Sequence, residues 1–293
     1  MTTPFRSEAE FEAALIDLLT RHGWSKELLR FPTEQQLIDN WAQILYNNNR
    51  DQDRLDDVPL TSSEMDQIIE QITELRTPLQ LNEFINGRSV AITRDAPEAH
   101  NLGKEVSLKI YDRREIAGGQ SCYQIARQPK FSTAAHKLMP ERRGDLILLI
   151  NGMPVIHLEL KRSGVPVSQA TNQIIKYAHE GVFTGLFSLV QIFVGMTPSE
   201  TLYFANPGPG GKFNPDFFFN WADFNNEPIN DWSAVVTSLL SIPMAHQLIG
   251  FYTVTDRAAG VLMVMRSYQY FAAHRIADRV ESHEWGSDNK GGY

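Results

Sequence analysis

The most constraining feature of the sequence is the stretch GDLILLINGMPVIHLELKRSG at residues 144–164. Its first part, Leu146 to Ile150, is continuously apolar, which is typical of a strand buried on both faces. Asn151 and Gly152 are the residues that a tight turn prefers, and alternating apolar and polar residues follow from Val155 to Lys161. The stretch therefore predicts a β-hairpin in the centre of a buried sheet.

The second strand of this hairpin gathers charge on one face. Successive side chains of a strand point to opposite faces, so His157, Glu159 and Lys161 share one face. Charges beside a hydrophobic sheet cost roughly several kcal/mol unless something compensates them. Glu159 and Lys161 could pair with partners at the strand end, or Asp145 could face Glu159 so that both carboxylates share a divalent cation. Without a bulge, direct opposition of Asp145 and Glu159 requires a three-residue loop, 151–153.

The second alternative predicts a specific chemistry. Carboxylate oxygens favour Mg²⁺ or Mn²⁺ over zinc, and such an ion suits phosphodiester hydrolysis. Lys161 would stabilise the charge that develops in the transition state or help to position the attacking hydroxide. Cys122 is the only cysteine, which excludes an internal disulfide and a cysteine-based zinc site and favours a small buried hydrophobe.

These residues resemble the core of a known superfamily. Asp145, followed after thirteen residues by Glu159-Leu160-Lys161, resembles the motif of the PD-(D/E)xK nucleases, with Gly144 in place of the eponymous proline. The resemblance implies that Asp145, Glu159 and the Leu160 backbone carbonyl bind the metal ion and that Lys161 is catalytic.

Two further parts of the motif are present. Gln173 and Tyr177 lie on one face of a predicted helix and resemble the QxxxY element of the RecB-type branch, which implies a place in the catalytic site. The alternative is an amphipathic helix whose tyrosine packs into the core. Glu12 precedes the helix-ending Gly23 by eleven residues, where these nucleases often carry a metal-binding glutamate, and the alternative is a solvated helical residue. For His157 the alternatives are a role in the site or an ordinary hydrogen bond.

The resemblance extends over nearly the whole chain. SEAEFEAALIDLL, ILLINGMPVIHLELKRSG, NQIIKY, LYFAN and MRSYQ follow in the order found in the N-terminal region of the R subunit of type I restriction-modification enzymes. This implies a magnesium-dependent endonuclease domain acting on double-stranded DNA without its own sequence specificity, with methyltransferase and specificity subunits as partners. It also implies ATP-binding motor domains in the full-length subunit, where Gln269 would contact the adenine.

We expect an α/β fold with a restriction-endonuclease-like core, in which helices flank a mixed central sheet. The nuclease domain would span residues 1–255, with a partly helical insertion at about 45–100, and residues 256–293 would be a linker and the truncated start of a RecA-like helicase domain. The first helix has capping-box residues at Ser7 and Glu10. The glycine-rich segment 206–215 is expected to be a surface loop, since Phe213 follows Lys212 where a phosphate loop needs Ser or Thr.

The net charge of −8 argues against a protein that coats nucleic acid through general positive charge. Basic residues nevertheless cluster in one third of the chain, either as a DNA-binding face or as a solvated surface: Arg127, Lys130, Lys137, Arg142, Arg143, Lys161, Arg162 and Lys176. No apolar stretch is long enough for a membrane span and no signal peptide is present, so we expect a cytoplasmic protein. A catalytically silent docking domain and a stand-alone repair or junction nuclease are the alternative functions.

Overall fold

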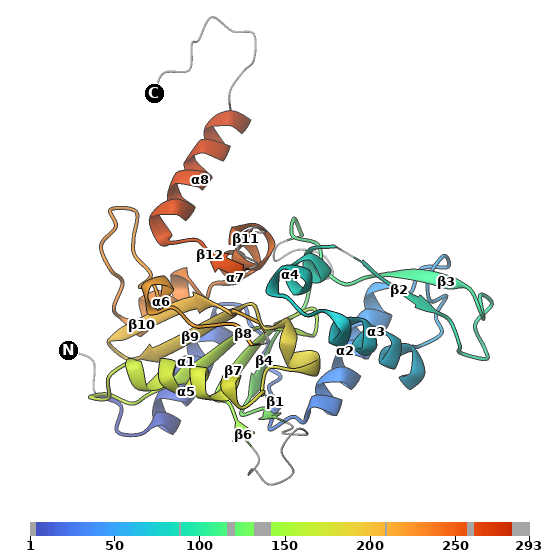
Figure 1. Ribbon diagram of the computed structural model, residues 1–293, viewed down its shortest axis with the longest axis horizontal. Coiled ribbons are helices and arrows are strands. Elements are labelled where there is room, and N and C mark those ends of the chain that lie inside the picture. The colour runs from blue at the N-terminus through green and yellow to red at the C-terminus, as the bar shows by residue number, and fades with distance from the viewer. Residues whose placement is uncertain are drawn as a thin grey trace, which may run out of the picture.

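A computed structural model describes residues 4–87, 89–115, 121–131, 142–208, 210–256 and 261–282. Its centre is a six-stranded mixed sheet (Figure 1), which confirms the expected α/β architecture. In spatial order the strands are β1 Leu29–Arg30, β4 Tyr123–Arg127, β7 Leu146–Ile150, β8 Met153–Leu160, β9 Ile192–Thr197 and β10 Glu200–Ala205. Neighbouring strands are antiparallel except for the parallel pairs β1–β4 and β8–β9.

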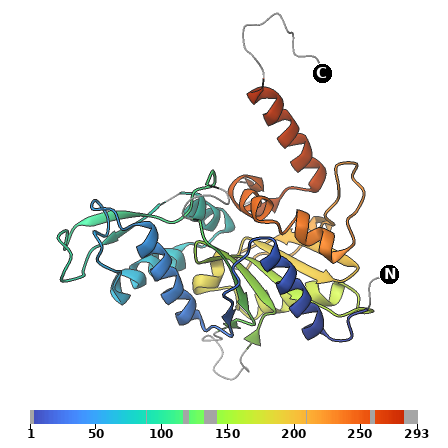
Figure 2. The same cartoon turned by 180° about the vertical axis from the view of Figure 1, so that it is seen from behind.

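Helices cover both faces of this sheet. Helix α1, Glu8–Arg21, lies on one face beside α6, Trp232–Ser238 (Figure 2). Helix α5, Ser168–His179, packs against β8 and β9 on the other face. The apolar stripe of α1 is buried, and Ser7 caps its first turn as predicted. The chain leaves the helix at Gly23, whose φ of 100° is easily adopted only by glycine.

The β7–β8 hairpin has the register that the sequence required, but not the loop that was expected. Its turn is only two residues, Asn151 and Gly152, because Ile150 pairs with Met153. Both turn residues have positive φ, 51° and 83°, as a tight hairpin turn demands. A β-bulge then leaves Val155 as an extra residue, so that Leu148 pairs with Ile156 and Leu146 with Leu158.

The bulge brings the two carboxylates into register. Without the bulge, Asp145 would lie opposite Leu158, and the side chains of Asp145 and Glu159 would not share a face. With it, the register continues to Asp145 opposite Glu159 at the end of the hairpin. The expected three-residue loop was therefore wrong, and a two-residue turn followed by a bulge achieves the same alignment.

A second lobe fills the region predicted as a partly helical insertion. It contains α2 Glu34–Asn48, α3 Ser62–Glu74, α4 Pro78–Asn86 and the antiparallel pair β2 Ser89–Thr93 with β3 Glu105–Lys109. Thr61 and Glu64 form a capping box at the start of α3. Arg94 and Glu64 form an ion pair of 2.8 Å with no exposed side-chain surface, which ties the helix to the chain after β2.

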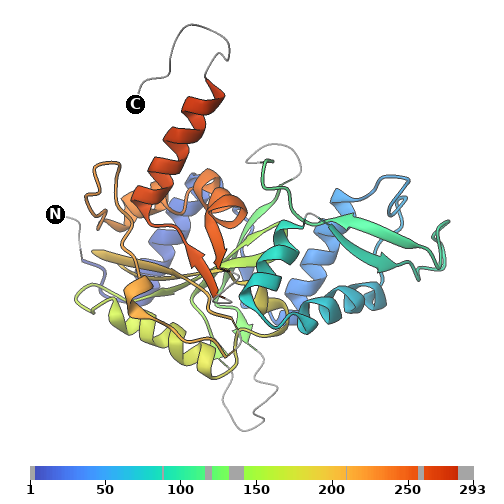
Figure 3. The same cartoon turned by 45° about the horizontal axis from the view of Figure 1, so that its top comes forward.

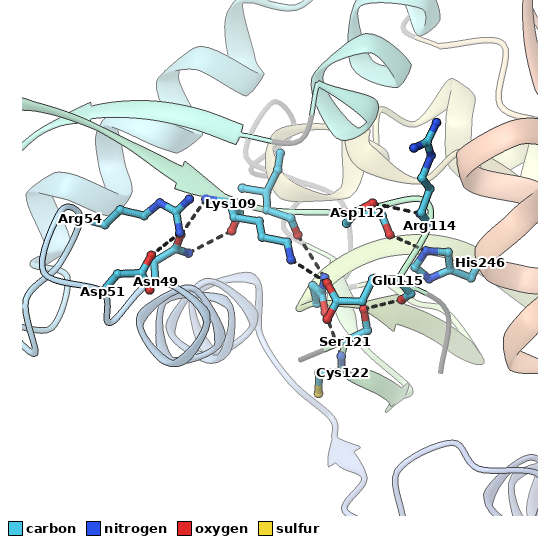
Figure 4. Close-up of polar contacts among 12 residues, drawn as sticks. Asn49, Asp51, Arg54, Lys109, Asp112, Arg114, Glu115, Ser121, Cys122 and His246 are labelled. Atoms are coloured by element: carbon cyan, nitrogen blue, oxygen red, sulfur yellow. Dashed lines mark hydrogen bonds and ion pairs between the residues drawn. The ribbon is translucent and has the colours of Figure 1, made fainter. Parts of the chain in front are cut away.

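Polar contacts attach this lobe to the rest of the molecule (Figure 4). Within the lobe, the Asn49 side chain joins α2 to β3, since it donates to the Lys109 carbonyl and accepts from the Lys109 N–H, at 3.0 and 2.7 Å. His246, on the C-terminal side of the chain, bonds the Asp112 carbonyl through Nε2 at 2.9 Å. Cys122 is half-buried rather than fully buried, and burial raises the pKa of its thiol.

The C-terminal segment forms a separate small hairpin and a projecting helix (Figure 3). Its elements are α7 Ile242–Gln247, a π-helical turn Leu248–Tyr252, β11 Thr253–Asp256, β12 Val261–Val264 and α8 Ser267–Glu281. Short elements elsewhere are β5 Lys130–Phe131, β6 Arg142–Arg143 and the 3₁₀ helices Gly185–Leu189 and Pro215–Phe217. In the described ranges no single helix is long and apolar enough to cross a membrane, and one bent pair, α6 with Ile242–Tyr252, passes by length and composition only.

Candidate active site

The structure brings Asp145 and Glu159 together at the end of the central hairpin. Asp145 immediately precedes β7, and its Oδ2 accepts a hydrogen bond of 2.7 Å from the backbone N–H of Leu160. This bond fixes the first carboxylate against the strand that carries the second. Glu159 is fully buried, whereas Asp145 is partly exposed, so the pair is reached from solvent on the Asp145 side.

Burial and mutual repulsion disfavour ionisation of this pair. Burial, then the charge of Glu159, raises the pKa of Asp145 well above its usual range, against the opposing effects of the Leu160 N–H and the Lys161 ammonium. Burial raises the pKa of Glu159 to about 8, although Asp145 and Lys161 act in the other direction. Two such carboxyl groups retain a proton at neutral pH unless a cation replaces it.

His157 orients Glu159 from the same face of β8. Its Nε2 lies 3.1 Å from Glu159 Oε1, and neither side chain has exposed surface. Burial lowers the pKa of His157 to about 4, so the ring is neutral and shares a hydrogen bond with the Glu159 carboxyl group through Nε2. Aromatic rings, including those of Phe131 and Phe183, enclose the imidazole. The expected hydrogen bond is present, and it ends on the candidate ligand.

Gly144, which replaces the superfamily's proline, is explained by the same histidine. A Cβ at this position would lie 2.6 Å from His157 Cε1 and 3.0 Å from the Phe131 ring. Glycine therefore leaves room for the ring that holds Glu159.

Lys161 follows β8 and is almost completely buried. Its Nζ donates to the Leu160 carbonyl at 3.0 Å and lies 3.3 Å from Glu8 Oε1 at the start of α1. The Leu160 carbonyl, predicted as a metal ligand, is thus bonded by the lysine in this structure. Glu8 was not predicted, because nothing in the sequence indicates that the first turn of α1 meets the end of β8.

Gln173 and Tyr177 form a short hydrogen-bonded chain beside the carboxylates. Gln173 Nε2 donates to the Tyr177 hydroxyl at 2.8 Å, and this hydroxyl donates to the Arg143 carbonyl at 2.9 Å. Burial raises the pKa of Tyr177 to about 12, with a further contribution from Glu159. The chain ties α5 to the backbone just before Asp145. The tyrosine is also buried in the core, so both alternatives for this residue describe part of its environment.

Glu12 lies on the other face of the sheet. Its carboxylate pairs with Arg127 and accepts a hydrogen bond from Gln128 at 3.1 Å, and only 3% of the residue is exposed. Arg127 pairs with Leu146 and thus shares the face of Leu158, opposite Glu159. Glu12 is therefore buried rather than solvated. Within the described ranges it has no hydrogen bond or ion pair with the three core residues, and its role as a metal ligand stays a prediction.

The geometry fits a hard cation in one specific respect. Glu159 Oε2 is buried and has no hydrogen-bond partner among the described residues. An unsatisfied buried carboxylate oxygen costs about 1–3 kcal/mol or more, and a cation would satisfy it. Among all residues that the structure describes, no group of three or more histidine, cysteine, aspartate or glutamate side chains is arranged to hold a metal ion. The candidate ligands are therefore Asp145, Glu159 and the Leu160 carbonyl.

Comparison with known proteins identifies the family. A family model of the type I restriction enzyme R protein N terminus matches residues 5–212, well over half of the 293 residues. The chain belongs to this family.

Relatives agree with this R protein N-terminal assignment. The type I restriction enzyme SsaAORF53P endonuclease subunit of Staphylococcus saprophyticus is 29% identical over 277 residues, covering 93% of this chain and 27% of the relative. The EcoprrI endonuclease subunit of Escherichia coli is 26% identical over 293 residues, covering 96% of this chain and 85% of the relative. The chain spans about a quarter of the length of the staphylococcal relatives.

The remaining predicted residues are Gln269 and the basic cluster. Gln269, in the first turn of α8, is exposed, and its side chain accepts from the Arg266 N–H at 2.9 Å as a helix cap. Of the predicted basic cluster, Arg127 and Arg142 pair with glutamates, whereas Lys176 is exposed. Lys137 lies outside the described residues.

Proposed function

We propose that this R protein N-terminal chain is a magnesium-dependent endonuclease domain that hydrolyses phosphodiester bonds of double-stranded DNA without reading sequence itself. The observation that carries this proposal is the buried Asp145–Glu159 pair with an unsatisfied Glu159 oxygen next to Lys161. A purely structural pair of like charges would be destabilising, because both carboxyl groups are taken out of water without a counterion at the second oxygen. The family and the names of the relatives as endonuclease subunits support the same activity.

Asp145, Glu159 and the Leu160 carbonyl would hold the ion, Mg²⁺ or Mn²⁺, because hard cations prefer oxygen ligands. When bound, such an ion supplies polarisation of a phosphate oxygen and a water of lowered pKa. His157 keeps Glu159 oriented through its Nε2, and the bond from Leu160 N–H keeps Asp145 in place. Lys161 contributes a compact positive charge beside the carboxylates, where it stabilises the anionic transition state once its bond to Leu160 O is released.

The wider setting is part of the proposal. We infer that the chain works in a cytoplasmic restriction complex with methyltransferase and specificity subunits, which would supply sequence recognition. ATP-binding motor domains would follow α8, with Gln269 at the adenine site. In this setting the helix cap that Gln269 now makes would be exchanged for a contact to the base.

The decisive experiment compares Asp145→Ala, Glu159→Ala and Lys161→Ala in the reconstituted full-length subunit with its partners. DNA cleavage should fall by about a thousandfold or more while ATP hydrolysis continues, because the motor does not use these residues. Glu10→Ala, on the exposed side of α1, is the matched control and should leave cleavage unchanged. Wild-type cleavage by Asp145→Ala would contradict the proposal and leave a docking domain, and cleavage by the chain without any partner would favour a stand-alone nuclease.

A further inference from the structure

An open hollow lies beside the carboxylate pair, along the outer face of α5. Four residues of this helix, with the helical spacing i, i+3, i+4 and i+7, line one side: Gln169, Asn172, Gln173 and Lys176. The opposite side of the helix, including Ala170 and Ile174, is buried against β8 and β9. Arg142, Lys161 and Tyr177 complete the lining. The polar stripe of α5 therefore faces a concave surface rather than flat solvent.

The lining has one sign of charge. Three of its residues are cations, three are amides and one is a phenol, and none of the lining residues is a carboxylate. This composition contrasts with the chain as a whole, which has 35 acidic and 27 basic residues and a net charge of −8. Arg142 is paired with Glu180 and Lys161 with Glu8, so Lys176 is the lining cation without an ion pair among the described residues, and its charge can attract an anion to this surface.

Much of the hydrogen-bonding capacity of this surface is unused. Within the described part of the chain, the side chains of Gln169, Asn172 and Lys176 have no hydrogen bond or ion pair, whereas Arg142 is held by Glu180 through two bonds of 2.8 and 2.9 Å. Asn172 and Lys176 are exposed. Amide and ammonium donors at this spacing suit a ligand that presents several negatively charged oxygens in a row.

The hollow is continuous with the proposed catalytic site. Lys161 and Tyr177 belong to both, and Glu159 lies in β8 two residues before Lys161. We propose that the outer face of α5 binds the backbone phosphates of duplex DNA next to the bond to be cut, with Lys176 and Asn172 as the main contacts. This inference rests on the proposed nuclease function. These phosphate contacts would hold the substrate beside the catalytic site of a domain that is acidic overall.

The test measures binding of a short DNA duplex to this chain carrying Asp145→Asn, so that cleavage does not interfere. Fluorescence anisotropy is recorded at increasing KCl, starting at about 20 mM, where phosphate contacts are strongest. Lys176→Glu should weaken binding roughly 10-fold and reduce the slope of log K against log salt by about 0.9, the value for one lost phosphate contact. Asn172→Asp should also weaken binding, and Lys104→Glu, an exposed lysine of the second lobe, is the matched control.

Two results would overturn the inference: equal duplex affinity of the Lys176→Glu and Lys104→Glu variants, or no duplex binding at low salt by the Asp145→Asn chain that retains Lys176. ATP and inorganic phosphate are added as competitors at constant ionic strength. Neither should displace the duplex, and full displacement by ATP would make the hollow a nucleotide site instead. A different result would contradict the nuclease proposal alone: Asp145→Ala would still cleave DNA, while Lys176→Glu would weaken duplex binding.

Discussion

Two buried charged pairs in this molecule have opposite characters. In the second lobe, Glu64 and Arg94 carry opposite charges and neither side chain is exposed. At the end of the central hairpin, Asp145 and Glu159 are two acidic groups whose ionisation is opposed by burial, and the charge of Glu159 further raises the pKa of Asp145. Both pairs remove charge from water, but only the first is electrically compensated by its own partner.

Hydrogen bonding separates the pairs further. Both oxygens of Glu64 are used, since they accept from Arg94, from the N–H groups of Thr61 and Asp95 and, more weakly, from that of Ala96. Glu159 has one oxygen bonded to His157 and the other unsatisfied. Arg94 Nε has no partner among the described residues, so the contrast lies between the carboxylates: a fully hydrogen-bonded buried carboxylate stabilises a local structure, whereas one with an unsatisfied oxygen indicates a candidate ligand site.

The largest expected effect concerns the satisfied pair. Arg94→Met should reduce the free energy of unfolding by about 3–5 kcal/mol, because Glu64 would be left buried without its counterion. Urea denaturation measures this change. Arg50→Met, which removes an exposed ion pair with Asp57, is the control and should cost less than about 1 kcal/mol. Similar losses of unfolding free energy in both variants would contradict the claim that Arg94 compensates the buried charge of Glu64.

Glu159→Gln should act in the opposite direction in metal-free protein. The pKa of Glu159 rises from 4.5 to about 8 on folding, so the wild type loses stability as pH rises from about 4.5 and levels off above about 8. Glutamine does not ionise, and the variant should therefore be more stable than wild type by several kcal/mol at pH 9, with no difference near pH 4. Denaturation in the presence of a chelator measures both values. A variant that is less stable than wild type at pH 9 would show that Glu159 is compensated within the protein.

The smallest expected effect on stability tests whether His157 positions Glu159. Gly144→Ala introduces a methyl group 2.6 Å from the His157 ring and should destabilise the protein by roughly 1–2 kcal/mol. It should also weaken binding of Mn²⁺, because His157 would move away from Glu159 Oε1. Thermal unfolding and calorimetric titration report the two effects. An unchanged midpoint with unchanged Mn²⁺ affinity would contradict the close fit at Gly144.

The sequence predicted which side chains meet at the end of the hairpin better than it predicted the turn and register by which the chain brings them together. Alternation along 155–161 placed His157 and Glu159 on one face, and the structure joins them by a hydrogen bond. The bulge at Val155 has no local signature, because a register shift depends on pairing with β4 and β9 as well as on the turn.

Contacts between distant segments were also beyond sequence reasoning. The spacing to Gly23 indicated Glu12, but the side of the sheet that α1 covers is decided by tertiary packing, which places Glu12 against Arg127 and brings Glu8 to Lys161. Similarly, the capping box at Thr61 was readable, whereas the use of Glu64 as the partner of Arg94 required knowledge of the β2–β3 pair.

The most direct test of the central claim is calorimetric titration of this chain with Mn²⁺. The wild type and Glu12→Gln should both bind the ion, whereas Asp145→Asn and Glu159→Gln should lose this binding while remaining folded by circular dichroism. Equal Mn²⁺ affinity in the wild type, Asp145→Asn and Glu159→Gln would contradict the claim that the paired carboxylates of the central hairpin hold a cation.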